Sequence, residues 1–214
     1  IFTFLSSKIH QSLIKNFDEC WIPDEDNSPY SGRLSKTNFT SVKTKYIGIL
    51  SRFKQQSADL KYDYLVLLSG PEPQRSQLEK VMLSVFKNTS KHVLLIQGKV
   101  EARQTEIRNN GITIVNFMTQ HQLQQSVAES KLIIARSGYS TIMDLAVMGK
   151  KAFFIPTPGQ TEQIYLAKMM AENNMVPFAK QHQFEFSDLD KVERFFGFEV
   201  FDPDNEILSK TLLV

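Results

Sequence analysis

The sequence predicts an α/β fold, and two observations support that prediction. Uninterrupted apolar runs occur five times, at Tyr64–Ser69, His92–Gly98, Ile112–Phe117, Lys131–Ala135 and Ala152–Pro156. Segments with the apolar spacing of a helix separate several of them, at Gln74–Asn88, Gln120–Glu129 and Thr141–Met148. A sheet with one face in water shows alternating apolar and polar residues, so continuous runs indicate strands that are covered on both faces. We therefore expect a doubly wound parallel sheet with helices on both faces.

The first 50 residues have a different character. Lys8–Phe17 carries a helical apolar stripe, and Asp18–Asp24 has the pattern of a short strand, in which we expect Trp21 to pack into a core. Residues 24–38 are rich in Asp, Asn, Ser, Pro and Gly, which indicates a loop or linker. We place a boundary near residue 50, between the tail of one domain with its linker (residues 1–50) and a second domain (residues 51–214). Because the chain starts without Met, we expect it to be part of a longer protein.

Composition argues against several functional classes. The chain has 25 basic and 23 acidic residues, a formal net charge of +2, and no basic cluster of the kind that binds nucleic acid. Its single cysteine, Cys20, cannot form a disulfide within the chain, and its four histidines are too scattered for a metal site. We therefore expect no metal, no cofactor and a reducing, cytoplasmic environment. No segment reaches the roughly 18 to 20 continuous apolar residues of a membrane span.

The residues that follow the apolar runs are the candidates for a binding site, because parallel α/β sheets bind ligands beyond the carboxyl ends of their strands. They are mostly glycines, hydroxyl residues and carboxamides, and they include Ser69, Gly70, Gly98, Phe117, Met118, Arg136–Ser140 and Thr157–Gln163. Such groups hydrogen-bond phosphates, ribose and sugar hydroxyls. They suit these ligands better than they suit hydrolysis by a nucleophile and a base.

The segment Ser137–Thr141 lies where a predicted strand ends and a helix begins. The free N–H groups, the hydroxyls and the positive end of such a helix can hold a diphosphate without a metal, and Gly138 permits a close approach. The alternative is a plain strand-to-helix turn in which Ser or Thr caps the helix. A second polar loop, Gly159–Gln163, precedes another helix, and its carboxamides suit sugar hydroxyls.

Together these motifs resemble the C-terminal, donor-binding domain of glycosyltransferase family 28. The resemblance rests on Ala135-Arg136-Ser137-Gly138-x-Ser140-Thr141-x-x-Asp144-Leu145 with Gly149-Lys150, and on Ile155-Pro156-x-Pro158-Gly159-Gln160-Thr161-Glu162-Gln163 with Ala167. It is strongest over about residues 130–175 and looser from Tyr64 onward. It implies a Rossmann-like parallel sheet that forms the C-terminal half of a GT-B fold, with residues 1–50 ending the acceptor-side domain.

The resemblance also implies roles for single residues. Asp144 stands where the family usually has Glu and would accept the ribose hydroxyls; alternatively, it is an acid that stabilises the first turn of its helix. Phe117 and Met118 would lie near the nucleobase, although Phe117 by itself is also explained as a core residue. Arg136 would neutralise phosphate or, alternatively, pair with a nearby carboxylate. The complete predicted donor site comprises Ser69, Gly70, Phe117, Met118, Arg136, Ser137, Gly138, Tyr139, Ser140, Thr141, Asp144, Gly159, Gln160, Thr161, Glu162 and Gln163.

The implied function is donor binding in a glycosyltransferase that moves a hexosyl group from a nucleoside diphosphate sugar. We expect a UDP-sugar; the acceptor is not identified, and a lipid-linked one is among the candidates. Glu162 and Leu166 depart from the family pattern, which leaves the donor sugar open. We name no catalytic residue, because the base that deprotonates the acceptor usually comes from the other domain, and we expect this chain alone to bind nucleotide without turning over.

Peripheral contact with the inner face of the membrane is expected only through that other domain. Two alternative functions stay open, a nucleotide-sugar hydrolase on the same scaffold and a non-catalytic nucleotide-binding domain.

Overall fold

A computed structural model describes residues 12–26, 28–36 and 42–199 of the chain. The chain divides into two compact units between residues 50 and 51, and each is described by itself. The first unit contains a parallel pair of strands, β1 (Glu19–Ile22) and β2 (Lys43–Tyr46), and a 3₁₀ turn, η1 (Gly32–Leu34). The expectation of a buried Trp21 was wrong, because 41% of this residue is exposed and its indole N–H donates to Glu19. The assignment of residues 1–50 to an acceptor-side domain remains a prediction. Of the predicted helix at Lys8–Phe17, residues 12–17 are described, and 12–14 are helical.

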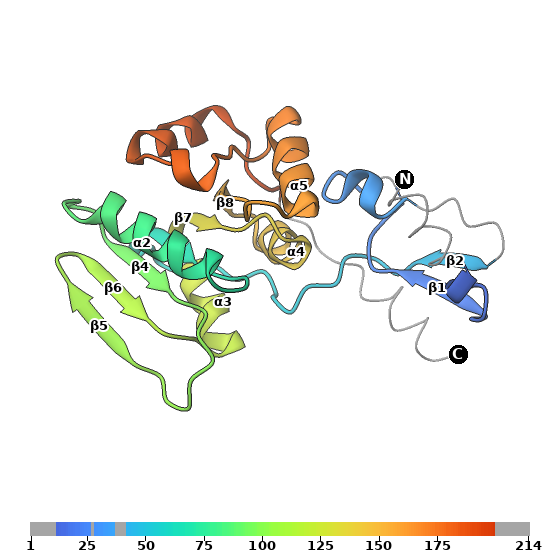
Figure 1. The fold of residues 1–214 in the computed structure, drawn as a ribbon, viewed down its shortest axis with the longest axis horizontal. Helices are drawn as coiled ribbons and strands as arrows, with labels where there is room; N and C mark the ends of the chain where they lie inside the picture. Colours follow the sequence, from blue (N-terminus) through green and yellow to red (C-terminus); the bar gives the residue numbers. More distant parts are fainter. Residues whose placement is uncertain (1–11, 27, 37–41, 200–214) are drawn as a thin grey trace. The chain divides into compact units, whose positions relative to one another are not determined.

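The second unit is built on a six-stranded sheet in the order β5–β6–β4–β3–β7–β8 (Figure 1). Its strands are β3 (Tyr62–Leu67), β4 (Val93–Ile96), β5 (Glu106–Asn109), β6 (Ile112–Val115), β7 (Ser130–Ala135) and β8 (Lys151–Phe154). Its helices are α2 (Gln74–Phe86), α3 (Gln120–Ala128), α4 (Tyr139–Met148) and α5 (Thr161–Glu172), followed by the 3₁₀ segments η2 (Gln181–Gln183) and η3 (Phe186–Arg194). All neighbouring strands are parallel except β5 and β6. The predicted α/β fold with a largely parallel sheet is confirmed.

Both faces of this sheet are buried. On one face, alternate strand residues such as Val66, Leu95 and Ile134 join side chains of α2 and of residues 184–192 in one apolar cluster. The intervening residues, such as Leu65 and Ile133, are fully buried too, so the opposite face is also covered. This double burial is the physical origin of the continuous apolar runs in the sequence.

One strand has no apolar run. All four residues of β5 are exposed, and the strand pairs antiparallel with β6 at the edge of the sheet. The turn between the two strands is Asn110-Gly111, with φ of 45° and 82°. This dipeptide is a strong hairpin signal, because both residues tolerate positive φ, and it is the feature from which β5 could have been predicted.

The order of the strands places a topological switch point at the carboxyl ends of β3 and β7. The chain runs from β3 through β4 to β6 on one side and then returns to place β7 and β8 on the other. At such a switch point neighbouring connections leave in opposite directions, and ligands bind between them. The ends are aligned, since Leu67 pairs with Ala135 and Ala135 pairs with Phe154. Residues 68–70, 136–141 and 155–163 therefore emerge at one edge of the sheet.

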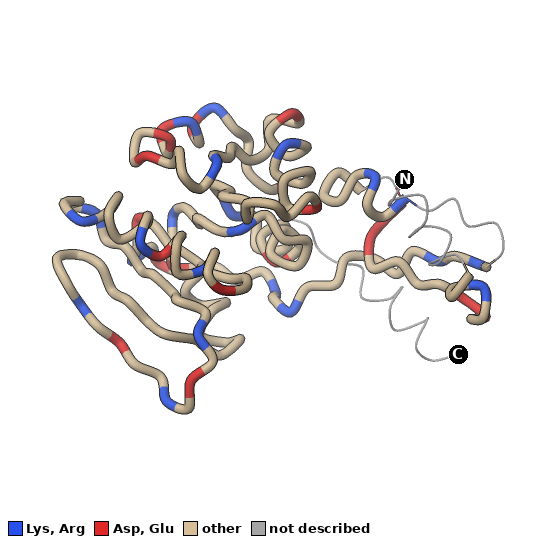
Figure 2. Tube along the Cα trace, viewed as in Figure 1, with Lys and Arg blue, Asp and Glu red and all other residues tan. Residues whose placement is uncertain are grey.

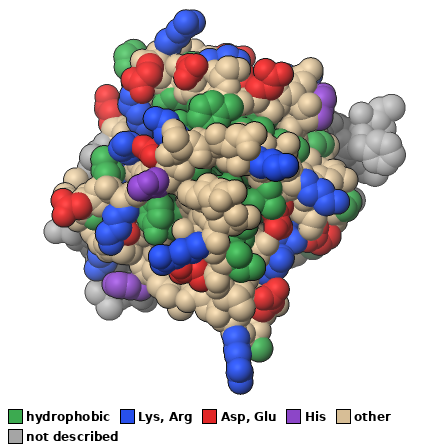
Figure 3. Space-filling view, turned by 90° about the vertical axis from the view of Figure 1, so that its left-hand side faces the viewer, with side chains coloured by type: hydrophobic (Ala, Val, Ile, Leu, Met, Phe, Trp, Pro, Cys, Tyr) green, Lys and Arg blue, Asp and Glu red, His purple; other side chains and the backbone are tan. Residues whose placement is uncertain are grey.

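The charges of the second unit are mixed in sign. Figure 2 shows basic and acidic residues interspersed along its trace, and Figure 3 shows both kinds among apolar side chains on the face that it presents. Within the described residues, no helix is both long enough and apolar enough to cross a membrane.

Candidate functional site

Three connections are tied together at the carboxyl edge of the sheet. The Ser137 hydroxyl, after β7, donates to the backbone carbonyl of Gln163 in the first turn of α5 at 2.7 Å. The Gln163 side-chain carbonyl accepts from the backbone N–H of Thr157, after β8, at 2.8 Å. Gly70, after β3, lies against the same threonine, because a Cβ added to it would be 3.8 Å from Thr157 Oγ1. The starts of α4 and α5 are thus neighbours.

The start of α4 is open. The helix begins at Tyr139, and its N-cap residue is Gly138, which has no side chain with which to cap it. The alternative in which Ser or Thr caps this helix was therefore wrong, because Ser140 and Thr141 lie inside the first turn. A Cβ added to Gly138 would meet no heavy atom of the described residues within 4 Å, so the space beside this glycine is open. Ser140 is exposed, while Gly138, Tyr139 and Thr141 are half-buried.

The start of α5 is open in the same way. Its N-cap residue is Gln160, whose side chain makes no capping hydrogen bond. Gly159 precedes it with φ of 85°, a left-handed conformation that favours glycine. Gly159, Gln160, Thr161 and Glu162 are all exposed. The first amides of both helices are therefore left for a ligand or solvent.

The other two helices that start at this edge supply their own capping groups. Thr119 and Gln122 form a reciprocal capping box at α3. At α2, the Glu72 carboxylate accepts from the Ser76 backbone N–H at 3.2 Å and from the Ser76 hydroxyl at 2.9 Å. The N-cap residue of α2, Pro73, makes no side-chain capping bond either, and there the preceding Glu72 takes that role.

Arg136 is turned into the interior. Only 1% of it is exposed, and its guanidinium donates to the Ile155 carbonyl at 2.9 Å, the Gln74 carbonyl at 3.0 Å and the Gln181 side chain at 2.6 Å. The alternative, a pairing with a local carboxylate, was wrong, since the partners of Arg136 among the described residues are two carbonyls and a carboxamide. Direct contact with phosphate is disfavoured too, because the side chain does not reach the surface. Burial lowers the pKa of Arg136 to about 10, so it remains a cation at neutral pH.

Asp144 is occupied by residues that the sequence did not point to. Its carboxylate accepts from the Ser51 hydroxyl at 2.8 Å and from Arg52 Nε at 3.0 Å, and only 5% of the residue is exposed. The alternative in which it stabilises the first turn was wrong: α4 begins at Tyr139, so Asp144 lies in the second turn. A ribose at this carboxylate would have to replace at least one of the two partners.

The segment that covers Asp144 also contacts α3. The backbone carbonyl of Arg52 accepts from the Gln120 side chain at 2.6 Å, so Arg52 links the first residue of α3 to α4. Half of the Arg52 side chain is exposed. No pattern in the sequence marks Ser51 or Arg52, because their role depends on a contact across more than 90 residues.

The remaining predicted residues lie at the same edge but are less closely grouped. Ser69 and Gly70 are exposed, and Gly70 borders Thr157. Phe117 and Met118 are half-buried and follow β6, which is separated from β3 by β4, so they are not adjacent to Gly138 in the sheet order. Leu166 is fully buried in the core of the unit.

The arrangement suits an anion with several acceptor oxygens. Two adjacent helix starts offer backbone N–H groups and positive dipole ends, and Ser140 and Thr161 add hydroxyls. The side-chain N–H₂ group of Gln163 has no partner among the described residues and is available as a donor. Arg136 adds a buried positive charge behind these groups.

A comparison with known families identifies the family of this chain. The sequence profile of the glycosyltransferase family 28 C-terminal domain matches residues 66–193, which is more than half of the chain. Two similar proteins are each named UDP-N-acetylglucosamine–N-acetylmuramyl-(pentapeptide) pyrophosphoryl-undecaprenol N-acetylglucosamine transferase. The one from Desulforamulus reducens is 23% identical over 189 residues, covering 80% of this chain and 50% of that protein. The one from Campylobacter fetus is 24% identical over 124 residues, covering 55% of this chain and 37% of that protein. The chain thus spans at most about half of these relatives.

A solved structure shows the same fold. The glycotransferase of kitacinnamycin superposes with a TM-score of 0.52 at 15% identity, over 76% of this chain and 44% of that chain. Acinetobacter baumannii MurG gives a TM-score of 0.48 at 15% identity, over 82% of this chain and 52% of that chain. The second unit has the fold of the C-terminal half of a GT-B glycosyltransferase.

Proposed function

This chain belongs to glycosyltransferase family 28, whose C-terminal domain it contains, and on that premise we propose that it binds the nucleoside diphosphate sugar of a glycosyl transfer reaction. The donor diphosphate lies at the start of α4, in the open space beside Gly138. The donor sugar lies toward Gln160–Gln163 at the start of α5. Both helix starts lack a capping side chain, and this is the observation on which the proposal mainly rests.

The physical basis is that an uncapped helix start is an anion site without a metal. Backbone N–H groups point along the helix axis toward the ligand, and the helix dipole favours negative charge there. In this proposal Arg136 stabilises the diphosphate by long-range electrostatic attraction, because its buried charge is poorly screened by water. Gly138 lets the diphosphate approach the backbone, and Ser140 with Thr141 supplies hydroxyl donors.

From the diphosphate, the ribose and the base extend on one side and the donor sugar extends on the other. We assign the ribose to Asp144, which requires at least one of the contacts of Ser51 and Arg52 with that carboxylate to open first. Phe117 and Met118 border the base. Ser69 and Gly70 follow β3, on the other side of the switch point, and border the diphosphate.

UDP is the donor nucleotide that the relatives support, because both named relatives use UDP-N-acetylglucosamine. The acceptor in their names is undecaprenol-linked, and we carry a lipid-linked acceptor and a location at the cytoplasmic face of the membrane as parts of the proposal. The catalytic base would come from outside residues 51–199. The alternatives are a UDP-sugar hydrolase and a non-catalytic binding domain.

Isothermal titration calorimetry with UDP, UMP and UDP-N-acetylglucosamine tests the proposal. We expect UDP and the UDP-sugar to bind and UMP to bind more weakly, because it lacks the second phosphate. Equal binding of UMP and UDP would contradict a diphosphate site. Release of free sugar from the UDP-sugar in water would favour the hydrolase instead.

A further inference from the structure

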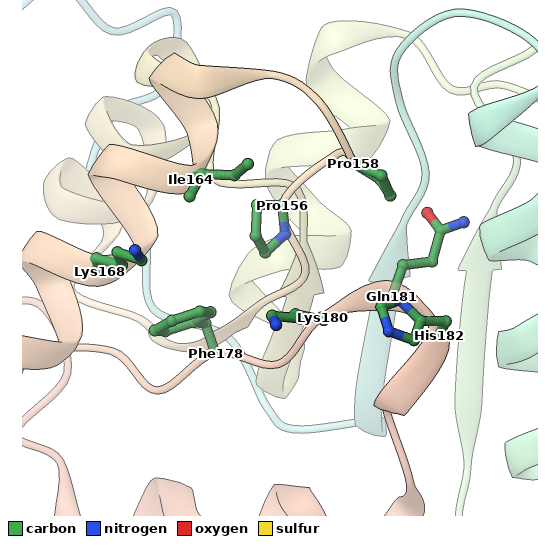
Figure 4. Close-up of a pocket in the computed structure, with 8 residues that line it drawn as sticks. All are labelled: Pro156, Pro158, Ile164, Lys168, Phe178, Lys180, Gln181 and His182. Atoms are coloured by element: carbon green, nitrogen blue, oxygen red, sulfur yellow. The ribbon is translucent and has the colours of Figure 1, made fainter.

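A pocket of about 240 Å³ is lined in part by the loop that follows β8 (Figure 4). Its walls are apolar and come from that loop, from α5 and from the segment before η2, namely Pro156, Pro158, Ile164 and Phe178. None of the predicted donor-site residues lines it. Most small-molecule pockets of proteins have roughly 300 to 1,000 Å³, so this one accepts a ligand smaller than a nucleotide sugar.

Two lysines line the same pocket. Lys168 of α5 and Lys180 before η2 are both exposed, and neither ammonium group has a partner among the described residues. Figure 4 shows the two lysines on either side of Phe178, at the rim of the pocket. Two cations that face a common space repel each other, and an anion between them would relieve that repulsion. His182 lines the pocket as well.

The chemistry of the walls and of the lysines defines one class of ligand. An apolar cavity excludes a bare inorganic anion, whose remaining oxygens would lose their water without replacement. An uncharged apolar molecule would fill the cavity but leave the lysines unpaired. We propose that this pocket binds a small amphiphilic carboxylate, with its short aliphatic body against Ile164 and Phe178 and its carboxylate between Lys168 and Lys180.

This site is independent of the proposed donor site, although one residue connects the two. Gln181, which lines the pocket, accepts a hydrogen bond from Arg136 at 2.6 Å, and its amide nitrogen lies 3.3 Å from Gln74 Oε1. The proposal nevertheless rests on the pocket and the two lysines alone. Failure of UDP to bind would therefore leave it intact.

Calorimetric titration of the full chain with octanoate, and with 1-octanol as its uncharged counterpart, tests the proposal. Octanoate should bind, and octanol should bind more weakly. The double variant Lys168→Glu/Lys180→Glu should weaken octanoate about tenfold, because two ion pairs are replaced by two repulsions. The control is Lys80→Glu/Lys87→Glu, at two exposed lysines of α2 and its C-cap, which changes the net charge equally.

A second variant, Ile164→Trp, fills the cavity without changing its charge, and it should abolish octanoate binding. Circular dichroism melting curves would establish that each variant folds. Equal affinity for octanol and octanoate, or unchanged octanoate binding in both the lysine variant and Ile164→Trp, would overturn the proposal. Co-sedimentation with phosphatidylglycerol vesicles that depends on the two lysines, without octanoate binding, would also overturn it in favour of a membrane lipid.

Discussion

Arg136 carries its charge inside the protein. It has no carboxylate partner among the described residues, so the cost of burying a cation is offset by hydrogen bonds from its guanidinium to Ile155, Gln74 and Gln181. Those partners belong to three separate segments that meet at the carboxyl edge of the sheet. Arg136 therefore holds these three segments together, and in our proposal its positive charge acts on the site from the protein interior.

Arg136→Ala should lower the free energy of unfolding by about 2 to 4 kcal/mol, because it leaves buried carbonyls without donors and opens a cavity. Urea denaturation measures this loss. The matched control is Arg103→Ala, at an exposed position, where a change within about 0.5 kcal/mol is expected. Equal effects of the two substitutions would show that the Arg136 contacts do not matter for stability.

Arg52 competes with ribose for Asp144 in this account. Arg52→Ala should therefore raise the affinity for UDP, by up to about fivefold, since a half-exposed ion pair contributes about 0.2 to 1 kcal/mol. Titration calorimetry of the variant and the parent chain measures the ratio. A clear loss of affinity would mean instead that Arg52 binds the donor directly.

At the scale of elements, α4 has one glycine at each end, and the two glycines have different functions. Gly149 follows the helix with φ of 59°, a left-handed conformation, and its N–H caps the last turn. Gly138 precedes the helix with φ of −77°, which any residue adopts, and faces free space. The backbone conformation thus favours glycine at position 149, and in our proposal the approach of a ligand favours glycine at position 138.

This difference predicts different costs for the same substitution. Gly149→Ala should destabilise the fold by about 1 kcal/mol, because the added Cβ strains the left-handed conformation. Gly138→Ala should change stability by less than about 0.5 kcal/mol. Thermal or urea unfolding of both variants checks the pair. A comparable loss at Gly138 would contradict the assignment of this residue to ligand approach.

Glu129, the C-cap residue of α3, accepts a hydrogen bond from Lys61, which precedes β3. This contact should make the stability of the fold depend on pH in the acidic range. Burial raises the pKa of Glu129, but hydrogen bonds from Gln125 and Lys61 outweigh burial and hold the pKa below its ordinary value of 4.5. The unfolded chain therefore binds a proton at higher pH than the folded chain does. This contribution to stability is complete above pH 4.5 and is lost as the pH falls through the lower, folded value.

Glu129→Gln should accordingly lower stability at pH 7 and flatten its decline below pH 4.5. Urea unfolding at pH 7, 5 and 3.5 tests this. Glu172→Gln, at an exposed position, controls for the loss of one carboxylate. A variant whose decline toward acid matches that of the parent chain would refute the assignment.

The elements of the second unit were predictable because burial on both sides of a sheet leaves a direct trace in the sequence. The strands of the five apolar runs and the four helices between and after them occur where the pattern indicates. β5 was missed because its exposed side chains carry no such trace. In the site, the chain order fixed which loops reach the carboxyl edge, and most of the predicted residues lie there.

Side-chain direction was not predictable from the sequence. Whether Arg136 points to solvent or inward depends on Gln74 and Gln181, which are 62 and 45 residues away. The occupation of Asp144 depends on a segment that lies more than 90 residues earlier. Helix capping could be judged only once the start of α4 was known. The N-cap residue is Gly138, and Ser140, two residues later, lies inside the first turn.

At the scale of the whole molecule, the second unit contains every element of the proposed donor site. β3, β7, β8, α4 and α5 meet at one edge, and the contacts of Ser137, Gln163 and Thr157 hold that edge together. We therefore propose that residues 51–199 are sufficient for nucleotide binding.

Calorimetric titration of UDP into the Gly138→Trp variant tests this central claim most directly. The indole would occupy the open space beside position 138 without forcing an unusual backbone, so the variant should fold and lose UDP binding by at least about tenfold. The control is Lys87→Trp, at the C-cap of α2 on the opposite edge of the sheet, which should bind UDP as the parent chain does. UDP binding that is unchanged in a folded Gly138→Trp variant would contradict the claim that the start of α4 holds the diphosphate.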